Sequence, residues 1–223
     1  LGKLATMIPI GSNPALRMNA LAAISSAFTA SFLYLVIVSV IKVWKKEIST
    51  NWDAIMIYSA AAIGALSFTF SDAEWFNAME SEVYALGTML VGLCIWLLMH
   101  WWEKADEKGN ERILLLVAFI VGISLGIHLL VVQVILVAGF IFYFRKHKYE
   151  RKGFLIAVAI SAAAFIAVYP ITVIWFPTWL GGDIKAFKIE DSGAVTLFAA
   201  LIAPALIYGI YWAAKNKKQT HAI

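Results

Sequence analysis

The sequence predicts an all-α integral membrane protein, a polytopic bundle of about seven helices that forms a single transmembrane domain over residues 1–223. Hydrophobic residues make up 62% of the 223 residues and charged residues only 14%, whereas a soluble domain is about 25% charged. The mean hydropathy is +0.81. Apolar runs long enough to cross a bilayer, about 20 residues each, recur along the chain. The lipid bilayer is therefore the first expected partner, and no basic soluble face for nucleic acid is present.

Loops that are rich in charge or in turn-forming residues divide these runs into helices. The expected helices are 19–41, 54–70, 72–82, 83–101, 113–127, 129–144, 154–176 and 194–213. Of these, 72–82 is expected to lie at the membrane surface, and Pro204 is expected to kink the last helix. Cys94 is the single cysteine, which excludes an internal disulfide. Because the chain starts at Leu1 without an initiator methionine, we expect it to be a fragment of a longer protein.

An acidic segment, 71–84, organises the chain. It holds four carboxylates and no Lys or Arg: Asp72, Glu74, Glu80 and Glu82. The spacing of Ser71 and Glu74 is that of a capping box, which predicts a helix start. At 100° per residue one face is apolar, formed by Trp75, Phe76, Met79 and Val83. We therefore expect an amphipathic helix on the outer membrane surface that leads directly into a spanning helix. The alternative is a solvated helix that only joins two spans.

The longest apolar run, 113–144, is expected to fold back on itself. As one helix it would be about 48 Å long, against a hydrocarbon core of about 30 Å. Gly122, Gly126 and His128 lie near its middle, so we expect two short helices broken near Gly126 to His128. Basic residues flank both ends of the run, which a hairpin would keep on one side of the membrane.

The positive-inside rule then orients the chain. Most Lys and Arg residues fall in four segments that the hairpin puts on one side, 42–53, 102–112, 145–152 and 215–218. Only four lie on the other side: Lys3, Arg17, Lys185 and Lys188. We therefore expect the basic loops to be cytoplasmic, in a bacterial inner membrane. The acidic helix, the turn at His128 and the 177–193 loop would share the outer face.

Two ionisable residues near this face are candidates for chemistry. Glu82 is expected where the surface helix enters the bilayer, and a partly desolvated carboxylate is suited to act as a general base. The alternative is a structural ion pair with Arg17 or His128. His128, at the hairpin tip, would bind a phosphate or carry a proton. Its alternative role is to cap the broken helix.

Other residues at the outer face carry weaker signals. Aromatic residues near the boundary are typical of an interfacial belt, with a stacking platform for a sugar as the alternative: Trp75, Tyr84, Trp175 and Trp179. Asp183, Glu190 and Asp191 lack the spacing of a metal site, so no metal ligands are predicted. The chain contains no P-loop, HExxH or nucleophile-elbow motif.

Three stretches together resemble segments of one known family. Residues 75–86, with Glu82, Val83 and Tyr84, resemble its F-W-x-x-A-x-x-x-E-V-Y-A-L segment, and residues 122–130 resemble its G-L-S-L-G-x-H segment. Residues 16–21 resemble its L-R-x-N-x-L start of a span. The family is DUF2723, multi-span proteins abundant in Bacteroidetes. It includes a vertebrate O-mannosyltransferase of plexin-type receptors and belongs with the GT-C glycosyltransferases. The resemblance covers roughly residues 1–145.

The resemblance implies a GT-C-like fold and a glycosyltransferase that uses a polyprenyl-phosphate sugar as co-substrate and a translocated protein as acceptor. It implies no cofactor beyond that donor and leaves a divalent metal open. By resemblance, Glu82 and Tyr84 would line the site, with His128 near the lipid phosphate or the acceptor and Asn19 beside the first loop. From their place at the outer face, His128, Arg17 and Lys185 are the candidates to lie beside the departing phosphate, and Trp75 is a candidate for substrate binding. The family's Asp-x-Gly-Glu and His-Pro-Pro-Gly motifs are absent. The main catalytic aspartate would therefore lie upstream, and this chain alone would be inactive.

Two alternatives from other functional classes remain open. A transporter or flippase predicts polar groups at mid-bilayer, of which the spans offer few: Ser25, Ser26, Thr29, Ser31 and Gln133. A non-catalytic membrane scaffold predicts that alanine at Glu82 or His128 leaves activity intact in the full-length protein.

Overall fold

A computed structural model shows the chain to be all-helical throughout the part that it describes, which comprises Met7, residues 13–45, 48–80 and 82–175, and residues 200, 204, 207 and 208. The chain divides into two compact units, residues 1–165 and 166–223, and each is described by itself. The described residues contain no strand and seven α-helices, which confirms the predicted fold class.

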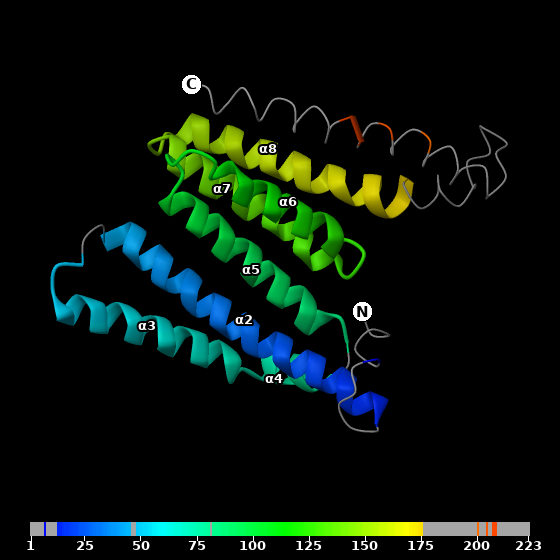
Figure 1. Cartoon of the computed structure of the whole chain (residues 1–223). Coiled ribbons are helices and arrows are strands. Elements are labelled where there is room, and N and C mark those ends of the chain that lie inside the picture. The colour runs from blue at the N-terminus through cyan, green and yellow to red at the C-terminus, as the bar shows by residue number, and fades with distance from the viewer. Residues whose placement is uncertain are drawn as a thin grey trace. The chain divides into compact units, whose positions relative to one another are not determined.

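The helices of the first unit are drawn in Figure 1. Their bounds are α2 Pro14–Lys45, α3 Asn51–Thr69, α4 Asp72–Met79, α5 Tyr84–Glu103, α6 Glu111–Ser124, the 3₁₀ turn η1 Leu129–Gln133, α7 Val134–Lys146 and α8 Arg151–Tyr169. Five segments of the described chain are long and apolar enough to cross a membrane. They are Pro14–Lys45, Asn51–Thr69, Tyr84–Glu103, Leu129–Lys146 and Arg151–Val168.

Helix α2 is the centre of one half of this unit. It packs against α3, α4 and α5, with α3 running alongside it in Figure 1. Val38 of α2 is buried with Ile57 and Ala61 of α3. Alanine at the crossing allows the two backbones to approach closely, which is how helices associate where lipid removes the hydrophobic driving force between them.

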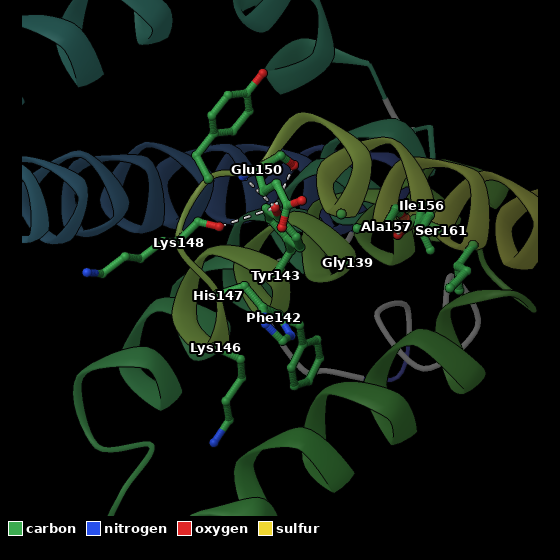
Figure 2. A pocket seen from close by; sticks show the side chains of 13 residues that line it. Gly139, Phe142, Tyr143, Lys146, His147, Lys148, Glu150, Ile156, Ala157 and Ser161 are labelled. Carbon is green, nitrogen blue, oxygen red and sulfur yellow. Dashed lines mark hydrogen bonds between the residues drawn. The ribbon is translucent and has the colours of Figure 1, made fainter.

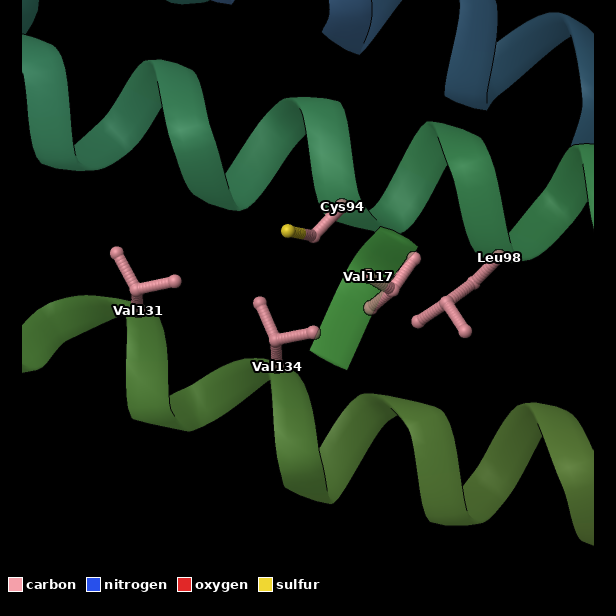
Figure 3. Packing of buried hydrophobic residues seen from close by; sticks show 5 residues of the cluster. All are labelled: Cys94, Leu98, Val117, Val131 and Val134. Atoms are coloured by element: carbon pink, nitrogen blue, oxygen red, sulfur yellow. The ribbon is translucent and has the colours of Figure 1, made fainter. Parts of the chain in front are cut away.

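The predicted hairpin is the centre of the other half. Helix α6 ends at Ser124, a turn follows, and η1 begins at Leu129, so the chain breaks where expected. Val117 of α6 and Val134 of α7 meet in one buried cluster with Leu98 of α5 (Figure 3). A continuous rod would separate Val117 and Val134 by about 25 Å. The fold-back is therefore confirmed.

The segment around α4 differs from the sequence prediction in two respects. The helix ends at Met79 rather than at residue 82, so Glu82 lies in the irregular link to α5. Ser71 caps the helix by accepting a hydrogen bond from the Glu74 N–H, at 3.4 Å. The reciprocal capping box is found instead at the start of α3, between Thr50 and Asp53, where the sequence analysis did not identify it.

The second unit is described only in short pieces. Its described part contains a π-helical segment, Pro170–Trp175, and helical residues at 200, 204, 207 and 208. The expected helix 194–213 falls mainly outside the described residues. The 177–193 loop lies wholly outside them, and so do Lys185, Lys188, Trp179 and the acidic residues of that loop.

Candidate functional site

The candidate site lies at the end of the first unit where the start of α5 meets the α6–η1 turn, and α4 packs against α2 and α5 at this end (Figure 1). Tyr84, the first residue of α5, packs its ring against the imidazole of His128, with centroids 4.7 Å apart and planes tilted by 55°. Two residues that are 44 positions apart in sequence are thus in direct contact. The expectation that the acidic segment and the hairpin tip converge on one end of the bundle is confirmed by this contact.

His128 caps the 3₁₀ turn that follows it. Its backbone is extended, and its Nδ1 accepts a hydrogen bond from the Leu130 N–H at 3.0 Å. The capping role considered in the sequence analysis is therefore present. An Nδ1 that accepts leaves the ring proton of the neutral imidazole on Nε2, where it is available as a donor. Capping consequently fixes the tautomer without using the nitrogen that a ligand would meet.

Gly87 brings the hairpin tip close to α5. A Cβ built on Gly87 would lie 3.5 Å from the His128 Cβ and 3.9 Å from a Leu130 methyl group. The two glycines near the predicted break, Gly122 and Gly126, do not have this role. Around Gly122 there is open space, and a Cβ on Gly126 would meet only the carbonyl oxygen of Ile123, at 3.5 Å. The glycine that positions His128 is thus on the neighbouring helix.

Glu82 is exposed and lies two residues before Tyr84, in the link between α4 and α5. Its carboxylate is attached to the same backbone segment as the ring that contacts His128. The structure therefore brings a carboxylate, a phenol and an imidazole to one end of the bundle. The sequence analysis expected Glu82 at the end of the surface helix, but the structure places it after α4. It is therefore more accessible than a carboxylate at the apolar margin of a helix would be.

Trp75 belongs to a different part of this surface. It stacks on Phe70, with centroids 6.4 Å apart, and is 53% exposed. Phe76 on the same face of α4 is 58% exposed. Exposed aromatic residues on one face of a short helix fit the interfacial belt. Among the predicted aromatic residues within the described ranges, Tyr84 contacts His128, while Trp75 packs at the α3–α4 junction.

The sequence analysis did not predict that Glu74 is buried. This residue is 3% exposed, although the next two residues in the sequence, Trp75 and Phe76, are exposed. Its Oε1 has no hydrogen-bond partner within the described part of the chain. Helix α4 packs against α2 and α5, so it turns its polar side inward and its apolar side outward. Helical periodicity could have predicted this burial, because it places Glu74 on the opposite side of α4 from Trp75 and Phe76.

The remaining predicted residues lie near the start of α2. Arg17 is half-buried and Asn19 is exposed, and both belong to the first turns of a helix that packs against α4. Both have interactions of their own in the structure. Within the described ranges, no group of three or more His, Cys, Asp or Glu side chains is arranged to hold a metal ion.

Comparison with known proteins adds one match. Residues 1–151 match the family model described as Protein O-mannosyl-transferase TMEM260 N-terminal domain. No solved structure matches the chain. The matched region includes α2 to α7 and therefore all the residues of the candidate site described above.

Proposed function

Because the chain belongs to the family of the Protein O-mannosyl-transferase TMEM260 N-terminal domain, we propose that it forms the membrane part of a protein O-glycosyltransferase. The sugar donor is a polyprenyl-phosphate sugar, and the acceptor is a Ser or Thr hydroxyl on a translocated protein. The family gives the protein acceptor and the membrane context. The lipid-linked donor and the GT-C mechanism are the finer part of the proposal.

The contact between Tyr84 and His128 beside Glu82 is the observation that carries this proposal. In an inverting transfer, the acceptor oxygen attacks the anomeric carbon, the bond from that carbon to the phosphate oxygen breaks, and the phosphate leaves. A carboxylate must take the hydroxyl proton, and the departing phosphate needs a donor beside it. Glu82 would line the base side of the site, and His128 would donate its Nε2–H to a phosphate oxygen. Arg17, near the start of α2, would add a cation beside the phosphate.

The opposite end of the bundle supports the proposed orientation. Arg145 donates to the carbonyl oxygen of Trp102, at 3.1 Å, and pairs with Asp106. This joins the basic loops 102–112 and 145–152 at the end of α5 that is farthest from Tyr84. We take this end as cytoplasmic under the positive-inside rule and the Tyr84 end as the outer face of a bacterial inner membrane.

The transporter alternative gains little support from the spans. Thr29 donates to the carbonyl oxygen of Ser25, and Ser25 donates to that of Leu21, so these hydroxyls are satisfied within their own helix. Thr29 also lies 3.5 Å from the Thr88 hydroxyl across the α2–α5 contact. Such short polar contacts are typical of helix association in membranes rather than of a substrate pathway.

The proposal is tested by complementation in the organism that carries the full-length gene. A deletion strain is rescued with wild-type protein, Glu82→Ala or the control Glu80→Ala, which removes an exposed carboxylate two residues away, and glycoproteins are stained. We expect Glu82→Ala to lose most of the staining and Glu80→Ala to retain it. Equal rescue by all three would remove Glu82 from the mechanism and favour the scaffold.

His128 needs a variant that separates capping from chemistry. Asn is among the best helix-capping residues, because its side-chain oxygen accepts from the backbone N–H. His128→Asn should therefore preserve the cap on Leu130 and the thermal stability of the protein, yet lose glycoprotein staining because the Nε2–H is gone. His128→Ala should lower both. Full activity of the Asn variant would assign His128 a structural role only.

A further inference from the structure

A cavity lies between α7 and α8, on a part of the fold that the glycosyltransferase proposal does not use. It has a volume of about 800 Å³, within the range of pockets that hold small molecules. Basic and aromatic residues from the α7–α8 turn form its rim, and the two helices form its floor (Figure 2). It is next to the basic loops, at the end of the unit away from Tyr84 and His128.

The rim is held in place by Tyr143. This side chain is buried, and its hydroxyl donates to the carbonyl oxygen of Glu150 and accepts from the Glu150 N–H, each at 3.0 Å. The same hydroxyl lies 3.4 Å from the carbonyl oxygen of Lys148. One phenol therefore fixes the turn that carries Lys148. The rim is a defined structure rather than a loose charged loop.

The charge of the rim favours an anion. Lys146 and Lys148 extend outward at the edge of the cavity, as Figure 2 shows, and His147 lies between them in sequence. Glu150 is the one acidic residue among those that line the cavity. Arg145, the preceding basic residue, is engaged elsewhere with Trp102 and Asp106. Two lysine ammonium groups thus remain to meet an anionic headgroup at the membrane surface.

The floor is apolar, and a glycine marks the point where its two helices come closest. Gly139 lets α8 approach α7 so closely that Ser161 lies directly against its backbone. Below the rim, Ile156 and Ile160 of α8 line the cavity and are 52% and 65% exposed. A hydrocarbon chain would cover these side chains while its headgroup stays at the lysines.

We propose that this cavity binds one anionic phospholipid, with its phosphate at Lys146 and Lys148 and an acyl chain along Ile156 and Ile160. Basic pockets between spanning helices are suited to this class of lipid. Other ligands would match only one half of the cavity. A free phosphate would leave the apolar floor uncovered, and a zwitterionic lipid would not use the net positive charge of the rim.

The proposal is tested by native mass spectrometry of the protein purified from vesicles that contain equal amounts of phosphatidylglycerol and phosphatidylcholine. We expect wild-type protein to retain one phosphatidylglycerol and no phosphatidylcholine. Lys146→Ala with Lys148→Ala should weaken retention about 30-fold, because each lysine at a membrane surface contributes about fivefold. The matched control, Lys104→Ala with Lys108→Ala, removes the same charge from another loop at this end and should retain the lipid.

The apolar half of the site has its own pair of variants. Ala157→Trp should fill the cavity and abolish retention with every lysine in place, whereas Ala159→Trp, on α8 but outside the cavity lining, should not. Inorganic phosphate, added as a competitor, should not displace the lipid. Equal loss in both lysine pairs, retention in Ala157→Trp, displacement by phosphate, or equal binding of phosphatidylcholine would each overturn the proposal.

Discussion

Among the described glycines, Gly139 of α7 has the most crowded surroundings, because it faces Ser161 of α8, and this contact gives a quantitative prediction. A Cβ added to Gly139 would lie 1.7 Å from the Ser161 Oγ, 2.8 Å from its Cβ and 3.9 Å from its Cα. Rotating the serine hydroxyl would relieve the first clash but would sacrifice its bond to the Ala157 carbonyl oxygen, at 2.8 Å. The second clash remains unless the helices separate.

The magnitude follows from two opposing effects. Gly139→Ala gains about 1 kcal/mol of helix propensity but overpacks the contact, which typically costs about 1–3 kcal/mol. We expect a net loss of about 1 kcal/mol in the free energy of unfolding. Adding Ser161→Gly leaves only the Cα, at 3.9 Å, so the overpacking term should vanish in the double variant. Ser161→Ala, which keeps the Cβ, should restore only part of it.

The free energy of unfolding is measured for wild type, Gly139→Ala, Ser161→Gly and the double variant. The purified proteins are unfolded in mixed micelles by raising the mole fraction of sodium dodecyl sulfate. Gly122→Ala is the matched control, because its Cβ would meet no atom within 4 Å; it should be neutral or stabilising by up to about 1 kcal/mol. Strictly additive effects of Gly139→Ala and Ser161→Gly would show that the two residues do not touch, and would refute this account of how α7 and α8 pack.

Three further predictions concern the rest of the first unit. Glu74→Met should raise the free energy of unfolding by about 1–3 kcal/mol, since it removes a buried oxygen without a partner in the described chain. Glu80→Met, an exposed control, should change the free energy of unfolding by less than about 0.5 kcal/mol. A Glu74→Met protein that is less stable than wild type would contradict this reasoning. Leu98→Ala, at the centre of the α5–α7 cluster, should cost about 2–5 kcal/mol, measured by the same micelle titration. Gly87→Ala should be tolerated, because its Cβ would make an ordinary contact at 3.5 Å, whereas Gly87→Leu should displace His128 and lose glycoprotein staining in the complemented strain.

The hairpin was predictable because two simple quantities exclude the alternative. The apolar run 113–144 is too long for one crossing, and the charges at its two ends favour the same side of the membrane. Both follow from composition and the rise of a helix, without knowledge of any tertiary contact. The ends of the expected helices are less well determined, because caps and 3₁₀ turns depend on local hydrogen bonds such as the one that Leu130 donates to His128.

The residues that set the site geometry were harder to predict, because they act across helices. Gly87 has no feature in its own sequence neighbourhood that links it to His128, and only the α5–η1 contact gives it a role. Gly139 and Ser161, at the α7–α8 contact, likewise have no feature in their own sequence neighbourhoods that links one to the other. Sequence periodicity places a residue on a face of its own helix, but it does not say which neighbour that face meets.

The orientation of α4 decides which carboxylate can serve a soluble acceptor. In a water-soluble protein the apolar face of such a helix would be buried, but here Trp75 and Phe76 are exposed and Glu74 is enclosed, as expected when lipid rather than water surrounds the helix. Glu74 is therefore sealed behind α4, and a protein hydroxyl cannot reach it without opening the α2–α4 contact. Glu82 is exposed in the link that follows α4 and is free of that constraint. If Glu74→Gln abolished glycosylation while Glu82→Ala did not, this assignment of the two carboxylates would have to be reversed.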